Sequence, residues 1–193
     1  MSKTAIEVCE GQQYDMDFEI QSHTSEEEYI EMIRLKTAVL IGCALQMGAI
    51  IGVASPEDRQ AIYDFGIQLG LAFQLQDDYL DTFGNQETFG KKIGGDILEN
   101  KKTILYHLAI KAGEEDQKQS LQSLLEGDNS IDDAVKINKV RSLFEATSAQ
   151  TAAQDLIKHH SDLADIELQR LGINEDHKNQ FRELKDWLMH RTY

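Results

Sequence analysis

Apolar residues recur every three or four positions along most of the chain, the spacing that places them on one face of an α-helix. Breaks in this pattern divide the chain into about seven predicted helices. No segment alternates apolar and polar residues in the way of a half-buried strand. The sequence therefore predicts an all-α fold. The predicted helices cover residues 3–17, 25–53, 55–82 and 96–113, and three more follow from residue 114, with breaks near residues 127–129 and 172.

Three of these helices begin at a recognisable cap. Ser25 and Glu28 form a capping box, in which each side chain accepts a hydrogen bond from the backbone of the other residue. Ser55 precedes the chain's single proline, and Asp58 stands where a reciprocal cap can form. Asp96 follows a glycine-rich segment and is placed to cap the fourth helix. These signals set the expected starts of the helices.

One apolar run needs a separate interpretation. Residues 38–54 are apolar except for Gln46 and approach the lower length limit of a transmembrane helix. Arg34 and Lys36 precede the run, and three glycines lie inside it. No other segment is comparable. We expect a buried central helix here and no membrane span, because a helix that is apolar all round is either core or membrane.

Charge and cysteine content narrow the class of protein. The net charge of −15 argues against nucleic acid and against an anionic membrane surface. Cys9 and Cys43 lie inside helical patterns without the spacing of a metal or redox site, as in a reduced cytosolic protein. Because the N-terminal residues become amphipathic and acidic, we expect no signal peptide. We expect a cytoplasmic protein with one domain over residues 1–193.

Three aspartates stand close together near the end of the third predicted helix. Asp77 and Asp81 are one turn apart, Asp78 is in the adjacent row, and Gln74 lies one turn earlier. Like charges within one turn repel each other, and at this end they also oppose the helix dipole. A divalent cation would explain them, because Mg²⁺ binds carboxylates, waters and phosphates. A solvated acidic helix end is the alternative, and the aspartates alone do not distinguish it from a metal site.

A group of lysines follows these aspartates. Residues 91–102 contain four of the chain's nineteen basic residues and flank the start of the next helix. Lysines near a helix N-terminus, beside a metal-binding carboxylate set, suit a diphosphate group. Ordinary surface lysines are the alternative. The segment lacks the spacing of a P-loop, and Thr82 stands where a calcium loop of the EF-hand type needs glycine.

These segments resemble a known family. Residues 73–81 (FQLQDDYLD), 90–97 (GKKIGGDI) and 100–101 (NK) are similar to the second aspartate-rich region of trans-prenyl diphosphate synthases of the farnesyl and geranylgeranyl type. Upstream, residues 11–15 resemble the family's GQxxD helix, and Tyr29 with Lys36-Thr37 resembles its Lys-Thr helix. The resemblance covers residues 11–102, and the order of its motifs makes it specific.

The resemblance implies a helical bundle of the isoprenoid synthase type and a metal-dependent prenyl transfer. Isopentenyl diphosphate would attack the cation formed from an allylic diphosphate, with Mg²⁺ as cofactor and Mn²⁺ as a substitute. Thr37 and Gln74 would direct dipoles at the developing cation. By this resemblance the catalytic residues are Lys36, Thr37, Gln74 and Asp77; the diphosphate-binding residues are Lys36, Lys91, Lys92 and Lys101; and the metal-binding residues are Asp77, Asp78 and Asp81.

The chain departs from the family in one respect. The family's first aspartate-rich motif precedes its GQxxD helix, and this sequence contains no second DDxxD. We therefore expect a bundle truncated at its N-terminal helices and inactive, or nearly so, by itself. We also expect exposed apolar faces, and with them a homodimer or a rearranged packing of the helices. The apolar residues expected to be exposed are Ile41, Leu45, Phe65 and Leu69.

Two other functions stay open. The chain could be a non-catalytic helical subunit or fragment of a heteromeric prenyl synthase, which would bind Mg²⁺ and diphosphate without turnover. It could also be a relative of the terpene synthases, although these use a different second metal motif and usually lack the GKKIGGD segment. The sequence leaves the product chain length open.

Overall fold

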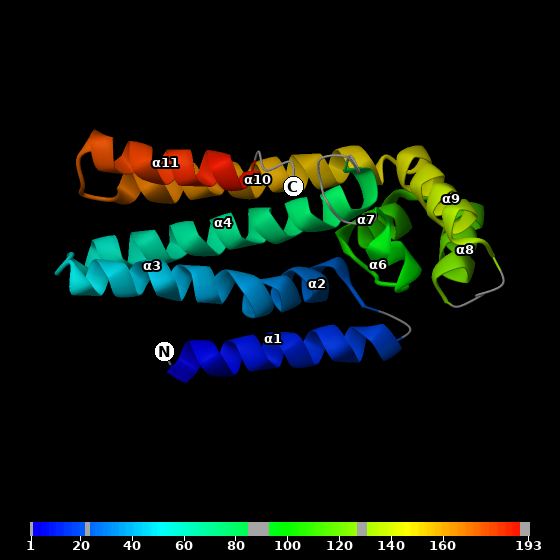
Figure 1. The fold of residues 1–193 in the computed structure, drawn as a ribbon, viewed down its shortest axis with the longest axis horizontal. Coiled ribbons are helices and arrows are strands. Elements are labelled where there is room, and N and C mark those ends of the chain that lie inside the picture. Colours follow the sequence, from blue (N-terminus) through cyan, green and yellow to red (C-terminus); the bar gives the residue numbers. More distant parts are fainter. Residues whose placement is uncertain (1, 22–23, 85–92, 127–130, 190–193) are drawn as a thin grey trace. The chain divides into compact units, whose positions relative to one another are not determined.

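The computed structural model describes residues 2–21, 24–84, 93–126 and 131–189, and every regular element within these ranges is a helix (Figure 1). This confirms the predicted all-α class. The helices are α1 (Ser2–Ile20), α2 (Glu26–Ile33), the π-helix η1 (Arg34–Ala38), α3 (Val39–Ile51), α4 (Pro56–Phe83), α6 (Gly95–Leu98), α7 (Ile104–Ala112), α8 (Glu115–Leu125), α9 (Asp133–Ala146), α10 (Ala149–Arg170) and α11 (Glu175–Met189).

The chain divides into two compact units. The first contains the described residues of Met1–Met16, Ile30–Gln74 and Leu156–Arg191, and the second those of Asp17–Tyr29 and Leu75–Asp155. The boundary at Gln74 falls inside α4, which is one continuous helix of 28 residues. Each unit is described by itself, and the expectation of a single domain stays a prediction.

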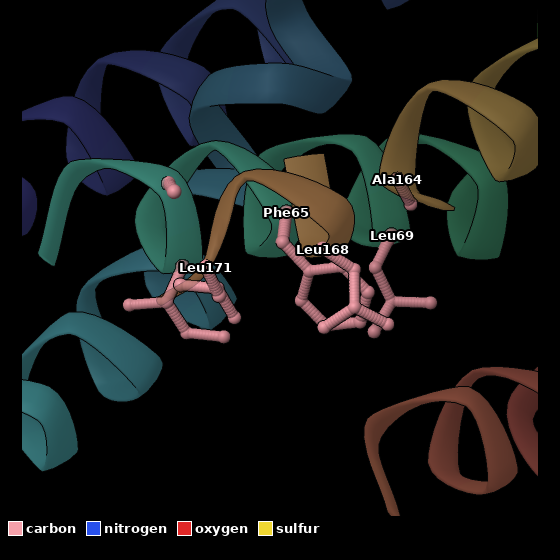
Figure 2. Close-up of a cluster of buried hydrophobic side chains, with 7 residues drawn as sticks. Phe65, Leu69, Ala164, Leu168 and Leu171 are labelled. Atoms are coloured by element: carbon pink, nitrogen blue, oxygen red, sulfur yellow. The ribbon is translucent and has the colours of Figure 1, made fainter. Parts of the chain in front are cut away.

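The core of the first unit lies between α4 and α10. Phe65 and Leu69 of α4 are 0% and 1% exposed and pack against Leu168 of α10 and Leu171 just after it, as Figure 2 shows. Phe181 of α11 completes this cluster with an edge-to-face contact to Phe65, at 5.8 Å between ring centroids. The prediction that Phe65 and Leu69 are exposed is therefore wrong, because α10 and α11 cover them.

The apolar run after Lys36 is buried on one side only. Val39 and Cys43 of α3 are buried, whereas Leu40 is 58% exposed and Ile51 is 79% exposed. Residues Glu26–Ile51 are long and apolar enough to cross a membrane by composition, with 33% of their most apolar window buried, and a single stretch of this kind is weak evidence for a span. The expectation of a fully buried central helix is thus met on one face only.

The core of the second unit is built around α7. Ile104, Leu105 and Ala109 of α7 are almost completely buried, as are Leu121 of α8 and Phe144 of α9. These apolar side chains recur at helical spacing, so three short helices can share one core.

Local signals placed two helix starts correctly. Ser25 and Glu28 form the predicted capping box, with the Ser25 N–H 2.7 Å from Glu28 Oε2 and the Glu28 N–H 3.1 Å from Ser25 Oγ. At α4, the Asp58 N–H donates to Ser55 Oγ over 3.0 Å. Asp58 Oδ1 also accepts from the N–H of Gly172, which ties the start of α4 to the turn after α10.

Two predicted helices are interrupted. The fourth is split into α6 and α7 at Asn100, and the segment after residue 130 is split into α9 and α10 at Ser148. Both residues adopt the left-handed conformation, with φ of 58° and 59°, which ends a right-handed helix. The prediction that Asp96 caps the fourth helix is also wrong. Gly94, with φ of 84°, is the N-cap of α6, and Asp96 lies in its first turn.

Candidate active site

The first group of candidate residues lies on a widened helical turn. The π-helix η1 carries Lys36 and Thr37 between α2 and α3. A π-helical turn contains one residue more than an α-helical turn, and such turns occur frequently at functional sites. The sequence predicted one regular helix here, because an inserted residue leaves no local signal.

Backbone contacts hold this turn from two sides. Gly11 of α1 lies so close that a Cβ there would collide with the backbone nitrogen of Lys36 and lie 2.8 Å from the carbonyl carbon of Leu35. Gly70 of α4 is equally near, and a Cβ there would lie 2.5 Å from Ala38 Cα. Only glycine permits both approaches. The turn is therefore fixed by the absence of two side chains.

An ion pair joins Lys36 to α1. Asp15 follows Gly11 by about one helical turn, and its Oδ2 is 2.5 Å from Lys36 Nζ. Both side chains stay partly exposed, at 26% for Asp15 and 37% for Lys36. Asp15 was not among the predicted site residues. The GQxxD motif was the available signal, but the motif does not reveal which side chain it meets.

Thr37 and Gln74 meet directly. The Thr37 hydroxyl donates a hydrogen bond of 3.1 Å to Oε1 of Gln74, and both side chains are half-buried. The structure thus brings together three of the predicted catalytic residues, Lys36, Thr37 and Gln74, in the first unit.

The second group of candidate residues lies at the end of α4 in the second unit. Asp78 is only 3% exposed, and its Oδ2 accepts a hydrogen bond of 2.5 Å from the hydroxyl of Tyr29 in α2. Asp77 and Asp81 are half-buried. Within the described residues, no three His, Cys, Asp or Glu side chains are grouped closely enough to hold a metal ion. Asp78, predicted in the row beside Asp77 and Asp81, is directed towards Tyr29 of α2.

Asp81 lies against the start of α6. Its Oδ2 accepts from the Asp96 N–H over 2.9 Å, and its main-chain oxygen accepts from the Gly94 N–H over 2.7 Å. Burial raises the pKa of the Asp81 carboxyl, and the nearby Asp96 carboxylate raises it further, although hydrogen bonds from the Asp96 and Gly95 N–H groups work in the opposite direction. A partly buried carboxylate beside a second carboxylate is a local excess of negative charge.

Lys101 is held by neighbouring carboxylates. Its Nζ is 3.1 Å from Asp96 Oδ1 and 2.7 Å from Glu99 Oε2. Burial by itself would lower the pKa of Lys101, but the hydrogen bonds to Glu99 and Asp96 outweigh burial and raise it. Lys101 was predicted to face a diphosphate, whereas Asp96 was predicted only as a helix cap. The other two predicted diphosphate-binding lysines, Lys91 and Lys92, lie outside the described residues.

The donor set of the second unit fits a hard divalent cation. Carboxylate oxygens are the ligands that Mg²⁺ prefers, and Mg²⁺ is usually bound by one or two of them together with phosphate oxygens. Asp77 and Asp81 are spaced one turn apart on α4. Burial and the nearby Asp96 carboxylate disfavour the ionised form of Asp81 and raise its pKa, and a cation bound there would favour that form.

The first unit also contains an apolar cavity of about 360 Å³. Its walls come from α3, from the first turns of α4 and from the segment around the start of α11, and include Leu45, Gly48, Ile62, Leu171 and Phe181. Lys36, Thr37 and Gln74 are not among its lining residues. The cavity is therefore separate from the polar group on η1.

An all-α fold with paired carboxylates at a helix end and a lysine on a π-helical turn is compatible with the family that the motifs indicated. The chain belongs to the polyprenyl synthetase family, whose sequence pattern matches residues 1–144. The family resemblance predicted from the motifs is confirmed.

Two archaeal relatives illustrate this membership. The chain is 35% identical over 191 residues to the short chain isoprenyl diphosphate synthase of Methanothermobacter thermautotrophicus, covering 98% of this chain and 57% of that protein. It is 35% identical over 196 residues to the geranylfarnesyl diphosphate synthase of Natronomonas pharaonis, covering 100% and 54%.

Solved structures agree. A crystal structure of a geranylgeranyl pyrophosphate synthase matches with a TM-score of 0.92 and 44% identity, covering 100% of this chain and 59% of that one. The polyprenyl synthase of Caulobacter crescentus CB15, complexed with calcium and isoprenyl diphosphate, matches with a TM-score of 0.88 and 30% identity, covering 100% and 58%. The fold is thus that of the isoprenyl synthases. The chain spans little more than half the length of these relatives.

Proposed function

We propose that this chain supplies part of the active site of a prenyltransferase that condenses isopentenyl diphosphate with an allylic diphosphate. The π-helical turn carries this proposal, since it brings Lys36 and Thr37 together with Gln74 and Asp15 in one unit. Family membership supports the reaction class. One relative of known structure binds calcium and an isoprenyl diphosphate, which supports a divalent cation and a diphosphate ligand.

The residues on η1 would act on the allylic diphosphate. The Lys36 ammonium would bind a phosphate oxygen, and Asp15 would hold that ammonium in place. When the allylic C–O bond breaks, positive charge develops on carbon. The oxygen atoms of Thr37 and Gln74 would then stabilise this charge by preorganised dipoles in a site from which water is excluded. Isopentenyl diphosphate forms the new C–C bond, and the released diphosphate takes up the proton.

The residues at the end of α4 would hold the metal. Asp77 and Asp81 are the proposed Mg²⁺ ligands, and Mn²⁺ is the proposed substitute. Bound Mg²⁺ would act as a Lewis acid that draws negative charge onto the leaving diphosphate. Lys101 would give up part of its contact with Asp96 and Glu99 to bind a phosphate oxygen.

The test is diphosphate binding followed by turnover. Inorganic diphosphate should bind to the chain by calorimetry only when Mg²⁺ is present, and Asp77→Ala should abolish that binding with little change in thermal unfolding. Asp155→Ala, at an exposed position in the middle of α10, is the matched control. Binding that is independent of Mg²⁺, or equal in Asp77→Ala and the control, would contradict the proposal.

Turnover separates an enzyme from a binding subunit. Product formation from isopentenyl and dimethylallyl diphosphates is measured for the chain alone and after addition of a related synthase that lacks this region. Turnover in either assay supports the prenyltransferase. Mg²⁺-dependent binding without turnover in both would favour the non-catalytic subunit of a heteromeric synthase.

We also propose that the chain self-associates as a homodimer. Four large apolar side chains, one at the start of α3 and three at or just after its end, are between 49% and 83% exposed, and exposed apolar surface of this kind favours association. They replace the patch expected around Phe65 and Leu69. Light scattering should give twice the mass of 21.9 kDa, and a monomer at tens of micromolar would contradict the dimer. The four side chains are Leu40, Ile50, Ile51 and Val53.

A further inference from the structure

A buried hydroxyl and carboxylate pair lies beside the proposed metal ligands. Tyr29 of α2 and Asp78 of α4 are 6% and 3% exposed, and the Tyr29 hydroxyl donates to Asp78 Oδ2 over 2.5 Å. The oxygen-to-oxygen distance is at the short end of the range for such hydrogen bonds. A carboxylate with so little exposure to water is costly unless it is hydrogen-bonded. The contact therefore stabilises Asp78 in its inward direction.

The ring of Tyr29 is itself fixed in place. It packs against the His107 imidazole of α7, with ring centroids 5.4 Å apart and planes inclined by 40°. His107 is 5% exposed, contacts the Tyr106 ring at 5.4 Å and hydrogen-bonds to the backbone of Lys102. Tyr29 thus occupies a point in the second unit where α2, α4 and α7 meet.

The fixed direction of Asp78 also constrains the neighbouring aspartates, because all of them lie on the same helix. Successive side chains on an α-helix point about 100° apart, and residues four apart lie on the same face. A fixed direction for Asp78 therefore fixes the rotation of the end of α4 about its axis. The directions of Asp77 and Asp81 follow, because all three belong to one continuous helix.

We propose that Tyr29 is a positioning residue that anchors Asp78, so that Asp77 and Asp81 keep one direction, and that Asp78 is an anchor and not a metal ligand. The inference rests on the proposed function where it concerns the metal. It goes beyond the family resemblance, which gives Asp78 as a metal-binding residue beside Asp77 and Asp81.

Asp78→Asn separates an anchor from a ligand. The amide oxygen of asparagine still accepts from the Tyr29 hydroxyl, so an anchor survives the change, whereas a ligand loses its charge. Mn²⁺ binding in the presence of inorganic diphosphate is measured by electron paramagnetic resonance on the full chain. We expect Asp77→Asn to weaken binding at least about 100-fold and Asp78→Asn to stay within about fivefold of the unaltered protein. Equal losses in the two variants would overturn the proposal.

Tyr29→Phe tests the anchor from its other end. It removes one oxygen and keeps the ring against His107, and we expect about tenfold weaker Mn²⁺ binding, the lower end of the effect of groups that orient metal ligands. Tyr79→Phe is the matched control on α4, since the Tyr79 hydroxyl accepts hydrogen bonds from the side-chain amides of Gln150 and Gln154, at 3.2 and 2.8 Å. Equal effects of the two Tyr→Phe changes would contradict the positioning role.

A third measurement does not depend on the metal. In the metal-free protein, Tyr29→Phe should shift the backbone amide resonances of Asp77 and Asp81, and Tyr79→Phe should shift them less. The unfolding equilibrium constant of the double variant Tyr29→Phe with Asp78→Leu should differ at least about fivefold from the value expected if the two single changes acted independently. Failure of Mn²⁺ to bind the unaltered chain would refute the proposed function. The anchoring role would be refuted if the two changes acted independently on unfolding and Tyr29→Phe left the amide resonances of Asp77 and Asp81 unchanged.

Discussion

The two groups of candidate residues are held in place by different kinds of interaction. In the first unit, η1 is fixed by main-chain contacts at Gly11 and Gly70, where any side chain would collide. In the second unit, Asp78 and Asp81 are fixed by hydrogen bonds to Tyr29 and to the start of α6. Steric fixation does not depend on ionisation, whereas hydrogen bonds to carboxylates do. The first group should therefore respond to changes in volume and the second to changes in charge.

The largest expected effect comes from adding volume beside η1. Gly11→Val should destabilise the protein by about 3 kcal/mol or more, because the added carbons collide with the backbone of Lys36 and cannot move aside. Gly48→Ala on α3 is the control, since a Cβ there meets nothing within 4 Å. It should be neutral or stabilise by about 0.5–1 kcal/mol, the gain in helix propensity. The free energy of unfolding in urea measures both changes. Equal effects of the two substitutions would show that η1 is not fixed by the close contact at Gly11.

A smaller effect is expected from acid. Burial lowers the pKa of His107 in the second unit to about 4, from an ordinary value of 6.5. Between these pH values the unfolded chain binds a proton that the folded chain does not. Stability should therefore be complete above pH 6.5 and fall as the pH drops towards 4, by up to about 3 kcal/mol for His107.

The first unit contains a weaker counterpart of this histidine. Burial also lowers the pKa of His160 to about 4, helped by repulsion from His159, and its Nδ1 lies 2.8 Å from Gln68 Oε1. Its contribution should be smaller, because it is partly exposed and solvent screens it. The unfolding midpoint should depend less on pH between pH 7 and 4.5 in His107→Gln than in His160→Gln. An exposed control, His177→Gln, should keep the pH dependence of the unaltered protein. If all three variants keep it, the two buried histidines do not cause the loss of stability in acid.

The smallest expected effect sharpens the comparison at Asp81. Asp81→Asn keeps an oxygen that can accept from the Asp96 N–H and removes the repulsion between the two carboxylates. We expect the metal-free protein to gain about 0.5–1 kcal/mol, as when other charge conflicts on a protein surface are relieved. Stabilisation by Mg²⁺ with diphosphate, measured as the rise in unfolding temperature, should be lost. A destabilised metal-free variant would show that the Asp81 charge is structural.

The sequence predicted features that depend on neighbouring residues and missed those that depend on distant ones. The caps at Ser25 and Ser55 are formed within four residues, so the pattern revealed them. The breaks at Asn100 and Ser148 come from backbone conformations that non-glycine residues adopt without a periodic signal. The inward direction of Asp78 depends on Tyr29, 49 residues away. Helical spacing places Asp78 in the row beside Asp77 and Asp81, but it does not show which row faces α2.

The family motifs carried the candidate site further than periodicity alone. They predicted Lys36, Thr37 and Gln74 as site residues, and all three lie in the first unit. They did not show that Asp15 holds Lys36 or that Asp96 and Glu99 hold Lys101, because these partners are set by tertiary packing. Side-chain partners were thus the part that the sequence could not provide.

The extra residue in η1 sets the phase between the helices on either side of it. Met32 precedes this turn and Val39 follows it, and both are buried in the first unit. Deletion of one residue between them would restore a regular α-helix and rotate one side of the segment by about 100° relative to the other. Met32 and Val39 could not then both keep their buried positions. The segment should consequently not tolerate a change in its length.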